Sequence, residues 1–500
     1  MPAAGGGKRM KAGRRLVLRW LAATVLLFSF LQAGADRGAL AAGSREGKIA
    51  ELKKAIPRFY EIYCTEETAA PLAGALAELE EADPADAGKS AELVDALAEG
   101  LGGLQFRWDS AVPRVYLATD DGSGASFGTR LDKSHDYVAA QITVVDEEGR
   151  VIACDTGWGG KVRIRGNTTS QGDKKPYNIR FSEKTDLFGM GASRKWVLLA
   201  DLYDPTLMRN YLALDFGKRL GLASTPDFRR VEVWMDGVCQ GLYLLTEKID
   251  AGQLGLSTKN RSGDFLVEMV FAGTQEGDNI YFSTASGKYF RLREPEGASE
   301  LLQKWIAEQL DQFEALLASG DWKKVSRMID VDSFVAWYIQ NEFFKTTDFA
   351  DTSVYLHCRD GRYYGGPGWD FDLSAGNCNP EVYGEALPSF EGALAAEAHY
   401  FRYLMKYPEF RREVLRKYLE AREYLEETVK PGGLLDQQCE RFREPLERNN
   451  ARWFKGAESY IVWQKTPEST YEENIESLRA WMKQRELWLT DYLTSLAAGE

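Results

Sequence analysis

Two aspartates lie two residues apart in the stretch GGPGWDFDLSAGN, residues 365–377. In an extended strand alternate side chains point to the same face, so we expect Asp370 and Asp372 on one face and Trp369 and Phe371 on the other. Two ionised carboxylates at this spacing repel each other unless a cation lies between them or one of them holds a proton. Mg²⁺ binds one or two protein carboxylates and shares its other positions with water and phosphate. The pattern therefore predicts a magnesium site, and the alternative is a solvated turn in which Asp372 caps the residues that follow.

A second acidic stretch, KTTDFADTS at residues 345–353, follows a predicted helix. Its Asp348 precedes Asp370 by 22 residues, and the sequence between them reads as a hairpin that can bring its two ends together. Asp348 is therefore a candidate to act with Asp370 and Asp372. The alternative is a loop acid with a capping role.

A basic stretch, RIRGNTTSQGDKKPYNIRF at residues 163–181, reads as a strand, a polar loop and a second strand opened by Lys174 and Lys175. Backbone N–H groups together with Lys and Arg side chains suit phosphate oxygens. The stretch matches neither the Walker A pattern nor G-x-G-x-x-G. An ordinary solvated hairpin with basic residues is the competing interpretation.

Two glutamates, Glu247 in YLLTEKI and Glu268 in GDFLVEM, end apolar strand-like runs. A carboxylate at the end of a buried strand needs a partner, so a structural ion pair is the expected role of each. The chain order is then a basic loop with lysines, a helix, a strand ending in Glu, a single Asp and a D-x-D. Protein kinases use their parts in this order, with a phosphate-facing lysine early and a metal-binding aspartate late.

The predicted secondary structure of the elements that position these residues changes along the chain. Residues 45–103 show apolar spacings of three and four, which predicts a helical N-terminal extension. Residues 112–298 read as alternating strands with one helix, including a hairpin at Asp236-Gly237. Residues 299–497 read as mainly helical, with a short β excursion that carries the D-x-D. The predicted fold class is α+β, with a β-rich lobe followed by a helical lobe.

The first 35 residues predict export. Six Lys and Arg residues precede the apolar run LAATVLLFSFLQA, and Ala33 and Ala35 are placed like a small-residue cleavage signal. The apolar run is shorter than the roughly 20 residues that span a bilayer. A secretory signal peptide is expected, with an uncleaved anchor as the alternative, and the remainder of the chain is expected to be secreted or associated with the cell surface.

Composition excludes some classes of function. The 500-residue chain has a formal net charge of −13, which disfavours a nucleic-acid partner. Its three His residues are scattered, which argues against a His-based zinc site. None of the six Cys residues form a C-x-x-C pair, so free thiols packed as small apolar residues are expected, although export would permit disulfides.

Several motifs in order resemble the spore-coat protein H (CotH) kinase-like family, whose members are atypical secreted or surface kinases. The matching segments run from about Val112 to Leu493 and are RIRGNTT, KKPYNIRF, DLFGMG, KWVLLADLYDPTLMRN, GLYLLTEKID, NEFFKTTD, GGPGWDFD, YPEFRREVLRKYLEAR and RELWL. The helical extension at 45–103 lies outside the resemblance.

The resemblance implies a two-lobed, atypical protein-kinase-like fold that binds ATP with Mg²⁺ and phosphorylates Ser or Thr on a coat or surface protein. By this resemblance Asp348 is the catalytic aspartate, and Asp370 is the metal-binding aspartate with Asp372 beside it.

The resemblance also implies roles for residues of the β-rich lobe and of the segment after it. Lys174 or Lys175 contacts phosphate, and Arg165 and Asn167 belong to the phosphate-side loop. Glu247 and Asp204 occupy recurrent acidic positions.

One departure from the family affects the expected activity. Some relatives carry an Asn after the catalytic Asp, where a second metal ligand could lie, whereas this chain reads ADTSVYL. Asn377 or Asp372 would have to substitute, or one metal suffices. A catalytically silent surface scaffold is therefore an alternative function. A glycan-active enzyme with paired carboxylates is a further alternative, but the basic loop and its lysines argue against it.

Overall fold

The computed structural model divides the described chain into two compact units, each considered by itself. Unit 1 comprises the described residues up to Ala200, with 229–245 and 444–449. Unit 2 comprises 201–228, 246–443 and 450–500. The predicted signal at 1–35 lies outside the described residues, which are 62–83, scattered positions between 86 and 105, 112–120, 122, 124, 137–155, 158–257, 263–275, 279–456, 458 and 461–499.

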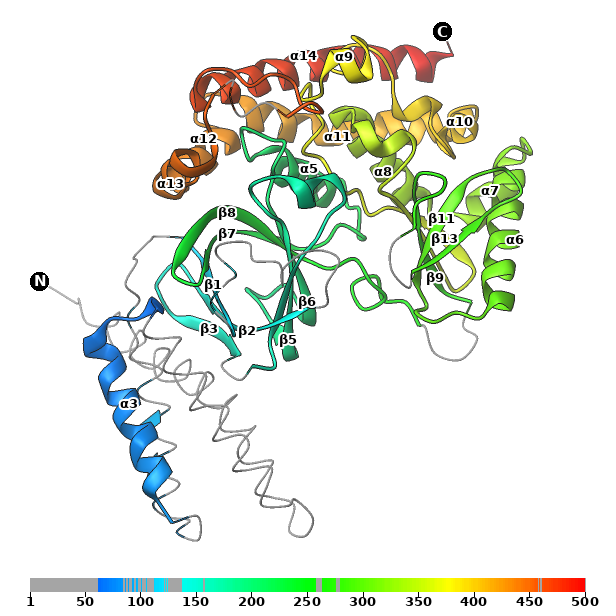
Figure 1. Cartoon of the computed structure of the whole chain (residues 1–500). Helices are drawn as coiled ribbons and strands as arrows, with labels where there is room; N and C mark the ends of the chain where they lie inside the picture. Colours follow the sequence, from blue (N-terminus) through cyan, green and yellow to red (C-terminus); the bar gives the residue numbers. More distant parts are fainter. Residues whose placement is uncertain are drawn as a thin grey trace, which may run out of the picture. The chain divides into compact units, whose positions relative to one another are not determined.

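Unit 1 is built on a β-barrel (Figure 1). Its eight-stranded sheet has the order β1-β7-β8-β6-β5-β4-β2-β3, and β1 also pairs with β2, which closes the sheet on itself. The strands are β1 Arg114–Thr119, β2 Val138–Val145, β3 Val151–Asp155, β4 Lys161–Ile164, β5 Tyr177–Asp186, β6 Ala192–Leu199, β7 Phe228–Met235 and β8 Val238–Glu247. Closure leaves few unpaired strand edges, which an open sheet would expose.

Alternating apolar residues fill the barrel interior. Val115 and Leu117 of β1 face inward with Ile142 and Val144 of β2, and all four are fully buried. The predicted hairpin at Asp236-Gly237 is confirmed, because β7 ends at Met235 and β8 begins at Val238. Both turn residues have positive φ, the geometry that a two-residue hairpin turn demands.

The N-terminal extension contributes a described helix, α3 Glu66–Glu81, to unit 1. Tyr63, Cys64 and Leu72 pack against Tyr116 and Trp234 of the barrel strands. The Tyr63 hydroxyl donates to the Leu117 carbonyl and accepts from the Gly237 N–H. Helix α3 lies within the region 45–103 that the sequence predicts to be helical.

Unit 2 contains a second sheet, of order β10-β11-β9-β12-β13, and most of the helices. Residues 246–298, which the sequence groups with the β-rich region, belong to this unit. Its strands are β9 Phe265–Met269, β10 Ile280–Ser283, β11 Tyr289–Glu294, β12 Val354–Arg359 and β13 Arg362–Gly365. Its α-helices are α5 Arg209–Arg219, α6 Glu300–Leu317, α7 Trp322–Met328, α8 Val331–Phe344, α9 Pro380–Tyr383, α10 Phe401–Leu404, α11 Pro408–Val429, α12 Leu434–Arg441, α13 Arg443–Trp453, which extends across 444–449 of unit 1, and α14 Tyr471–Ala498.

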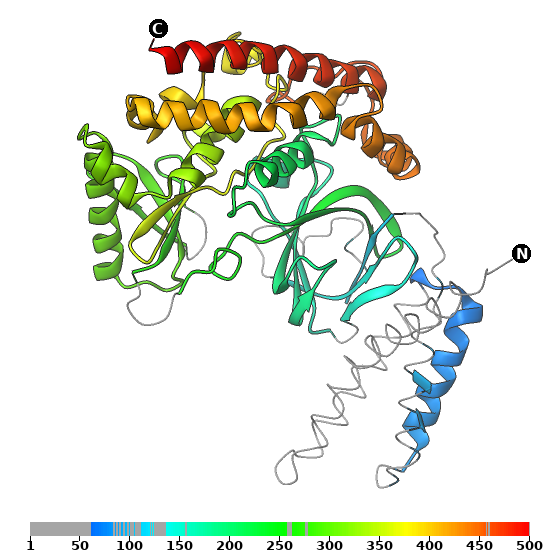
Figure 2. The same ribbon diagram turned by 180° about the vertical axis from the view of Figure 1, so that it is seen from behind.

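Helix α8 is the central helix of unit 2. Twelve of its residues are buried, including the polar residues Gln340, Asn341 and Glu342. Asp330 caps its N-terminus by accepting from the Ser333 N–H. It packs against α5, α11 and α14, and Figure 2 shows α11 (orange) and α14 (red) side by side.

All six cysteines are free. In the part of the chain that the structure describes, no helix combines the length and the apolar character needed to cross a bilayer.

Replacing Ile179 of β5 by Ala should lower the free energy of unfolding by about 2–5 kcal/mol, because its fully buried side chain would leave a cavity in the barrel. Lys184→Ala on the same strand is the control; its side chain is exposed and the expected change is within about 0.5 kcal/mol. Urea unfolding followed by tryptophan fluorescence measures both. Equal losses in the two variants would contradict the assignment of the barrel interior.

Candidate active site

Asp348 lies just beyond the buried helix α8. The helix ends at Phe344, and Lys345 adopts a left-handed conformation with φ of 48° that turns the chain away. Asp348 follows on the 3₁₀ turn η4 Thr347–Ala350, half-buried, with the Thr347 hydroxyl 3.4 Å from its Oδ1. A rigid helix end therefore fixes the position of this carboxylate.

The D-x-D lies in a loop, so the prediction that it forms a strand is wrong. Strand β13 ends at Gly365, and Pro367, which has no N–H to donate to a ladder, follows two residues later. Asp370 has a φ of 68°, outside the strand region, and its Oδ2 accepts from the Ser353 hydroxyl at 3.3 Å. Asp372 is 6% exposed. The two acids are thus placed by loop geometry and not by strand alternation.

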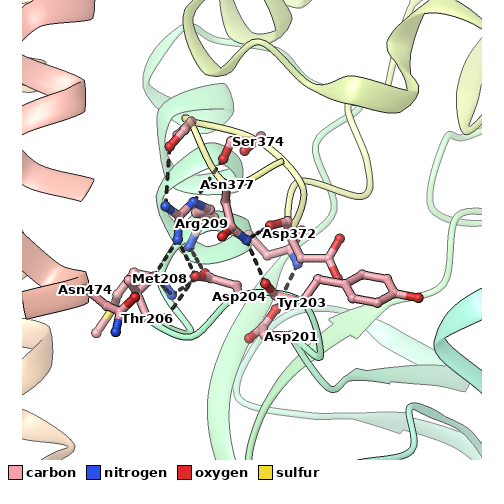
Figure 3. Close-up of polar contacts among 12 residues, drawn as sticks. Asp201, Tyr203, Asp204, Thr206, Met208, Arg209, Asp372, Ser374, Asn377 and Asn474 are labelled. Atoms are coloured by element: carbon pink, nitrogen blue, oxygen red, sulfur yellow. Dashed lines mark hydrogen bonds and ion pairs between the residues drawn. The ribbon is translucent and has the colours of Figure 1, made fainter. Parts of the chain in front are cut away.

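The loop of residues 366–377, hereafter the acid loop, is anchored to α8 and to the segment before α5. The Ala375 N–H donates to the Phe344 carbonyl at 2.6 Å, and the Thr347 N–H donates to the Leu373 carbonyl at 3.4 Å. The Asn377 side-chain amide donates to the carbonyls of Tyr203 and Asp372, each at 2.7 Å (Figure 3). Asn377, expected as a possible second metal ligand, thus uses its amide nitrogen to hold the loop backbone.

The segment Asp201–Asn210 adds residues that the sequence interpretation missed. Asn210 donates to Asp201 Oδ1 and accepts from the Phe371 N–H, both at 2.8 Å, so it links Asp201 to the peptide between the two loop acids. Arg209 donates from Nε to the Ser374 carbonyl at 2.9 Å and pairs with Asp204 (Figure 3). The adjacent Arg209-Asn210 pair, inside the helix that the sequence predicts among the strands, was the available signal.

Asp204, predicted at a recurrent acidic position, has a structural role in the described structure. Its carboxylate accepts from the backbone N–H groups of Thr206, Met208 and Arg209 at 2.8–2.9 Å, which caps the start of α5. It is 1% exposed and is paired with the Arg209 guanidinium.

The clustered acids perturb one another. Burial, followed by the charges of Asp370, Asp201, Asp348 and Asp204, raises the pKa of Asp372 well above its usual range. Burial and then the charge of Asp370 raise the pKa of Asp348 to about 7. Asp348, Asp370 and Asp372 therefore lie near enough for their charges to interact.

The carboxylates of Asp370 and Asp372 are suited to a hard cation whose remaining ligands are water and phosphate. Among the described residues, none donates a hydrogen bond to the carboxylate of buried Asp372. In the same part of the chain, no group of three or more His, Cys, Asp or Glu side chains could hold a metal ion without further ligands. Mg²⁺ in phosphate-transferring sites takes one or two carboxylates and completes its shell with water and phosphate. Asp370 and Asp372 fit that requirement.

A cavity of about 160 Å³ adjoins the acid loop in unit 2. It is lined by Arg209, Ala375, Gly376, Asn377, Pro388, residues 465–468, Asn474, Ser477 and Trp481. Its lining includes three residues of the acid loop, 375–377.

The basic residues form their own group in unit 1. Arg165 and Asn167 lie on the loop before the 3₁₀ turn η3 Thr168–Gln171, and half-buried Lys175 donates to the Ser170 carbonyl of the same loop at 3.0 Å. Lys174 is 3% exposed; its ammonium donates to the Leu242 carbonyl at 2.6 Å and lies over the Tyr243 ring. The structure therefore brings Lys175, and not the Lys174 ammonium, together with the loop.

The strand-ending glutamates have structural partners. Glu268 pairs with Arg293 at 3.5 Å, which confirms the expected ion pair. Glu247 accepts from the Asp227 N–H at 2.8 Å, and burial raises its pKa. A backbone hydrogen bond thus takes the place of the ion pair expected at Glu247.

Comparison with known proteins identifies relatives of the chain. The model of the family described as CotH kinase protein matches residues 162–489, more than half of the chain. The inner spore coat protein H of Bacillus subtilis (strain 168) is 24% identical over 233 residues, which cover 45% of this chain. The match spans 60% of that relative's length.

Asp348→Asn should raise Tm at pH 8 in EDTA and leave it nearly unchanged at pH 4. The folded pKa of about 7 exceeds the unfolded value of about 3.9, so the ionised side chain costs stability as pH rises through this window. Asn carries no charge at either pH. Differential scanning fluorimetry from pH 4 to 8 measures the difference, with exposed Asp351→Asn as the control. A gain of equal size at pH 4 and pH 8 would rule out the proposed ionisation.

Proposed function

Because the chain belongs to the CotH kinase protein family, we propose that it transfers the γ-phosphoryl group of ATP to a Ser or Thr hydroxyl of a surface or coat protein. The observation that carries the proposal is the convergence of Asp348 with Asp370 and Asp372 at the end of α8. Such a cluster matches the needs of phosphoryl transfer, in which positioning and charge neutralisation supply most of the rate. The two-lobed kinase-like layout and export through residues 1–35 are parts of the same proposal.

Each acid has a role in the proposed reaction. The Asp348 carboxylate accepts a hydrogen bond from the acceptor hydroxyl and takes its proton as the new bond forms. The acceptor oxygen bonds to the γ-phosphorus while the bridging β–γ P–O bond breaks, and ADP leaves. Asp370 and Asp372 would hold Mg²⁺, which offsets negative charge on the phosphates when bound.

The basic loop of unit 1 is assigned the phosphate contacts. Arg165, Asn167 and Lys175 lie on or against one loop, where side-chain cations and backbone N–H groups are available together. Glu247 and Asp204 are assigned supporting roles because each accepts backbone hydrogen bonds. No nucleic-acid partner is proposed, given the net charge of −13.

A catalytically silent scaffold is the second candidate. It is favoured by the sequence ADTSVYL after Asp348, which lacks the Asn found in some relatives. Such a protein would transfer no phosphate. ATP with Mg²⁺ would raise its Tm if it binds nucleotide and would leave its Tm unchanged if it does not.

Asp348→Asn and Asp370→Asn should each lower phosphate transfer from [γ-³²P]ATP to a Ser/Thr peptide library by about 10²-fold or more, because each removes a preorganised charge. Asp351→Asn, an exposed neighbour on the same turn, should retain activity within about twofold. Mass spectrometry locates the product phosphate. Full activity in both site variants would contradict the assignment, and an inactive but nucleotide-binding parent protein would favour the scaffold.

Lys175→Met should raise the KM for ATP by about tenfold with little change in Tm, because the half-buried ammonium lies against the basic loop. Lys174→Met should change Tm more than the KM, since its ammonium is buried against Leu242 and Tyr243. Initial-rate kinetics and scanning fluorimetry on both variants separate the two effects. The reverse pattern would assign the phosphate contact to Lys174.

A further inference from the structure

The segment that follows the acid loop, Gly384–Ala396, has little regular structure, yet buried charged side chains hold its backbone. Apart from the start of the 3₁₀ turn η5 Ala395–Glu397, it forms turns and bends. Most of its side chains are exposed or half-buried. Its order must therefore come from contacts to its main chain.

Lys345 makes one set of these contacts. Its side chain, at the end of α8, is 3% exposed, and its ammonium donates to the carbonyls of Ala386 at 2.7 Å, Ser389 at 2.9 Å and Glu391 at 2.5 Å. An ammonium has three N–H donors, so all three are used on this one segment.

A fully buried ion pair makes the second set. Glu342 of α8 and Arg485 of α14 are both 0% exposed, with Nη2 2.7 Å from Oε1. Arg485 also donates to the carbonyls of Phe390 and Gly392 at 2.7 and 2.9 Å. The other Glu342 lone pairs accept from the N–H groups of Leu394 and Ala396 at 2.9 and 3.0 Å. Each charge is therefore balanced by its partner and by backbone dipoles, as burial demands.

The same supports hold the acid loop. The end of α8 accepts from Ala375 through the Phe344 carbonyl. Trp481 of α14 donates to the Pro388 carbonyl at 2.8 Å, and its ring lies so close to Gly376 that a Cβ there would be 2.6 Å from Cδ1. A shift of Gly384–Ala396 would therefore disturb the loop that carries Asp370 and Asp372.

In many protein kinases a segment near the metal-binding acid becomes ordered only when a phosphorylated side chain pairs with Arg. Here Lys345 uses its three donors on main-chain carbonyls, and Arg485 uses Nη1 and Nη2 on carbonyls and on Glu342, while its buried Nε makes no hydrogen bond to the described residues. Ser389 is the one Ser or Thr in 384–396, and its hydroxyl oxygen accepts from the Glu391 N–H at 3.1 Å.

We propose that Lys345 and Arg485 are positioning residues that keep Gly384–Ala396, and with it the acid loop, in the working conformation without phosphorylation of the segment. The proposal rests on the kinase function proposed above. The proposal predicts an enzyme that is active without prior phosphorylation. The two cationic side chains that could bind a phosphate group on the segment are already hydrogen-bonded to its main-chain carbonyls.

The test compares Lys345→Met with Ser389→Ala in the phosphatase-treated, full-length protein. Lys345→Met leaves the Glu342–Arg485 pair intact, so no buried charge is stranded. It should lower kcat for transfer to a Ser/Thr peptide library by tenfold or more while the KM for ATP stays within twofold. It should also speed hydrogen exchange of peptides from 384–396. Ser389→Ala should change none of these, and neither should Lys430→Met, a control at an exposed lysine of α11's C-terminus.

Loss of transfer in Ser389→Ala, or activity that returns only when Ser389 is phosphorylated, would overturn the proposal. Unchanged hydrogen exchange of 384–396 in Lys345→Met would overturn it as well. If the parent protein transfers no phosphate at all, the kinase function fails. The exchange measurement, made without nucleotide, then still decides whether Lys345 holds the segment.

Discussion

The repulsion among buried carboxylates is the constraint on which the candidate site depends. Burial, followed by the charge of Asp370, raises the pKa of both Asp348 and Asp372. The described contacts hold them through uncharged groups, such as the Ser353 hydroxyl and the Asn210 and Asn377 amides. Arg209, the nearby cation, is used on Asp204 and on loop carbonyls. Under the proposed function, a bound Mg²⁺ would lower the cost of ionising these carboxylates.

Helix α8 carries much of that packing. Its twelve buried residues fix the helix among α5, α11 and α14, so its C-terminus is a rigid reference point. From this end the Phe344 carbonyl holds the acid loop, while Glu342 and Lys345 hold Gly384–Ala396. One helix end therefore determines the positions of Asp348 and of both neighbouring segments. Each of these contacts is made to the main chain of the segment that it holds.

The basic loop of unit 1 is held in a different way from the acid loop. It is an exposed connection between two barrel strands, and Lys175 is tied to the Ser170 carbonyl without being buried. Lys174, one residue earlier, points its ammonium toward Leu242 and the Tyr243 ring. Both lysines precede β5, which begins at Tyr177, so the loop conformation and not strand alternation gives them different surroundings.

The sequence by itself determined local features: the hairpin turn at Asp236-Gly237, the presence of a helix before Asp348, and the positions of the acids along the chain. These follow from φ preferences and apolar spacing, which act over a few residues. Only the tertiary structure decided that Asp370 lies in a loop with positive φ, and that Asn210 reaches Phe371 across 161 residues of chain. Contacts between distant segments depend on how the helices pack, and no spacing within either segment encodes that distance.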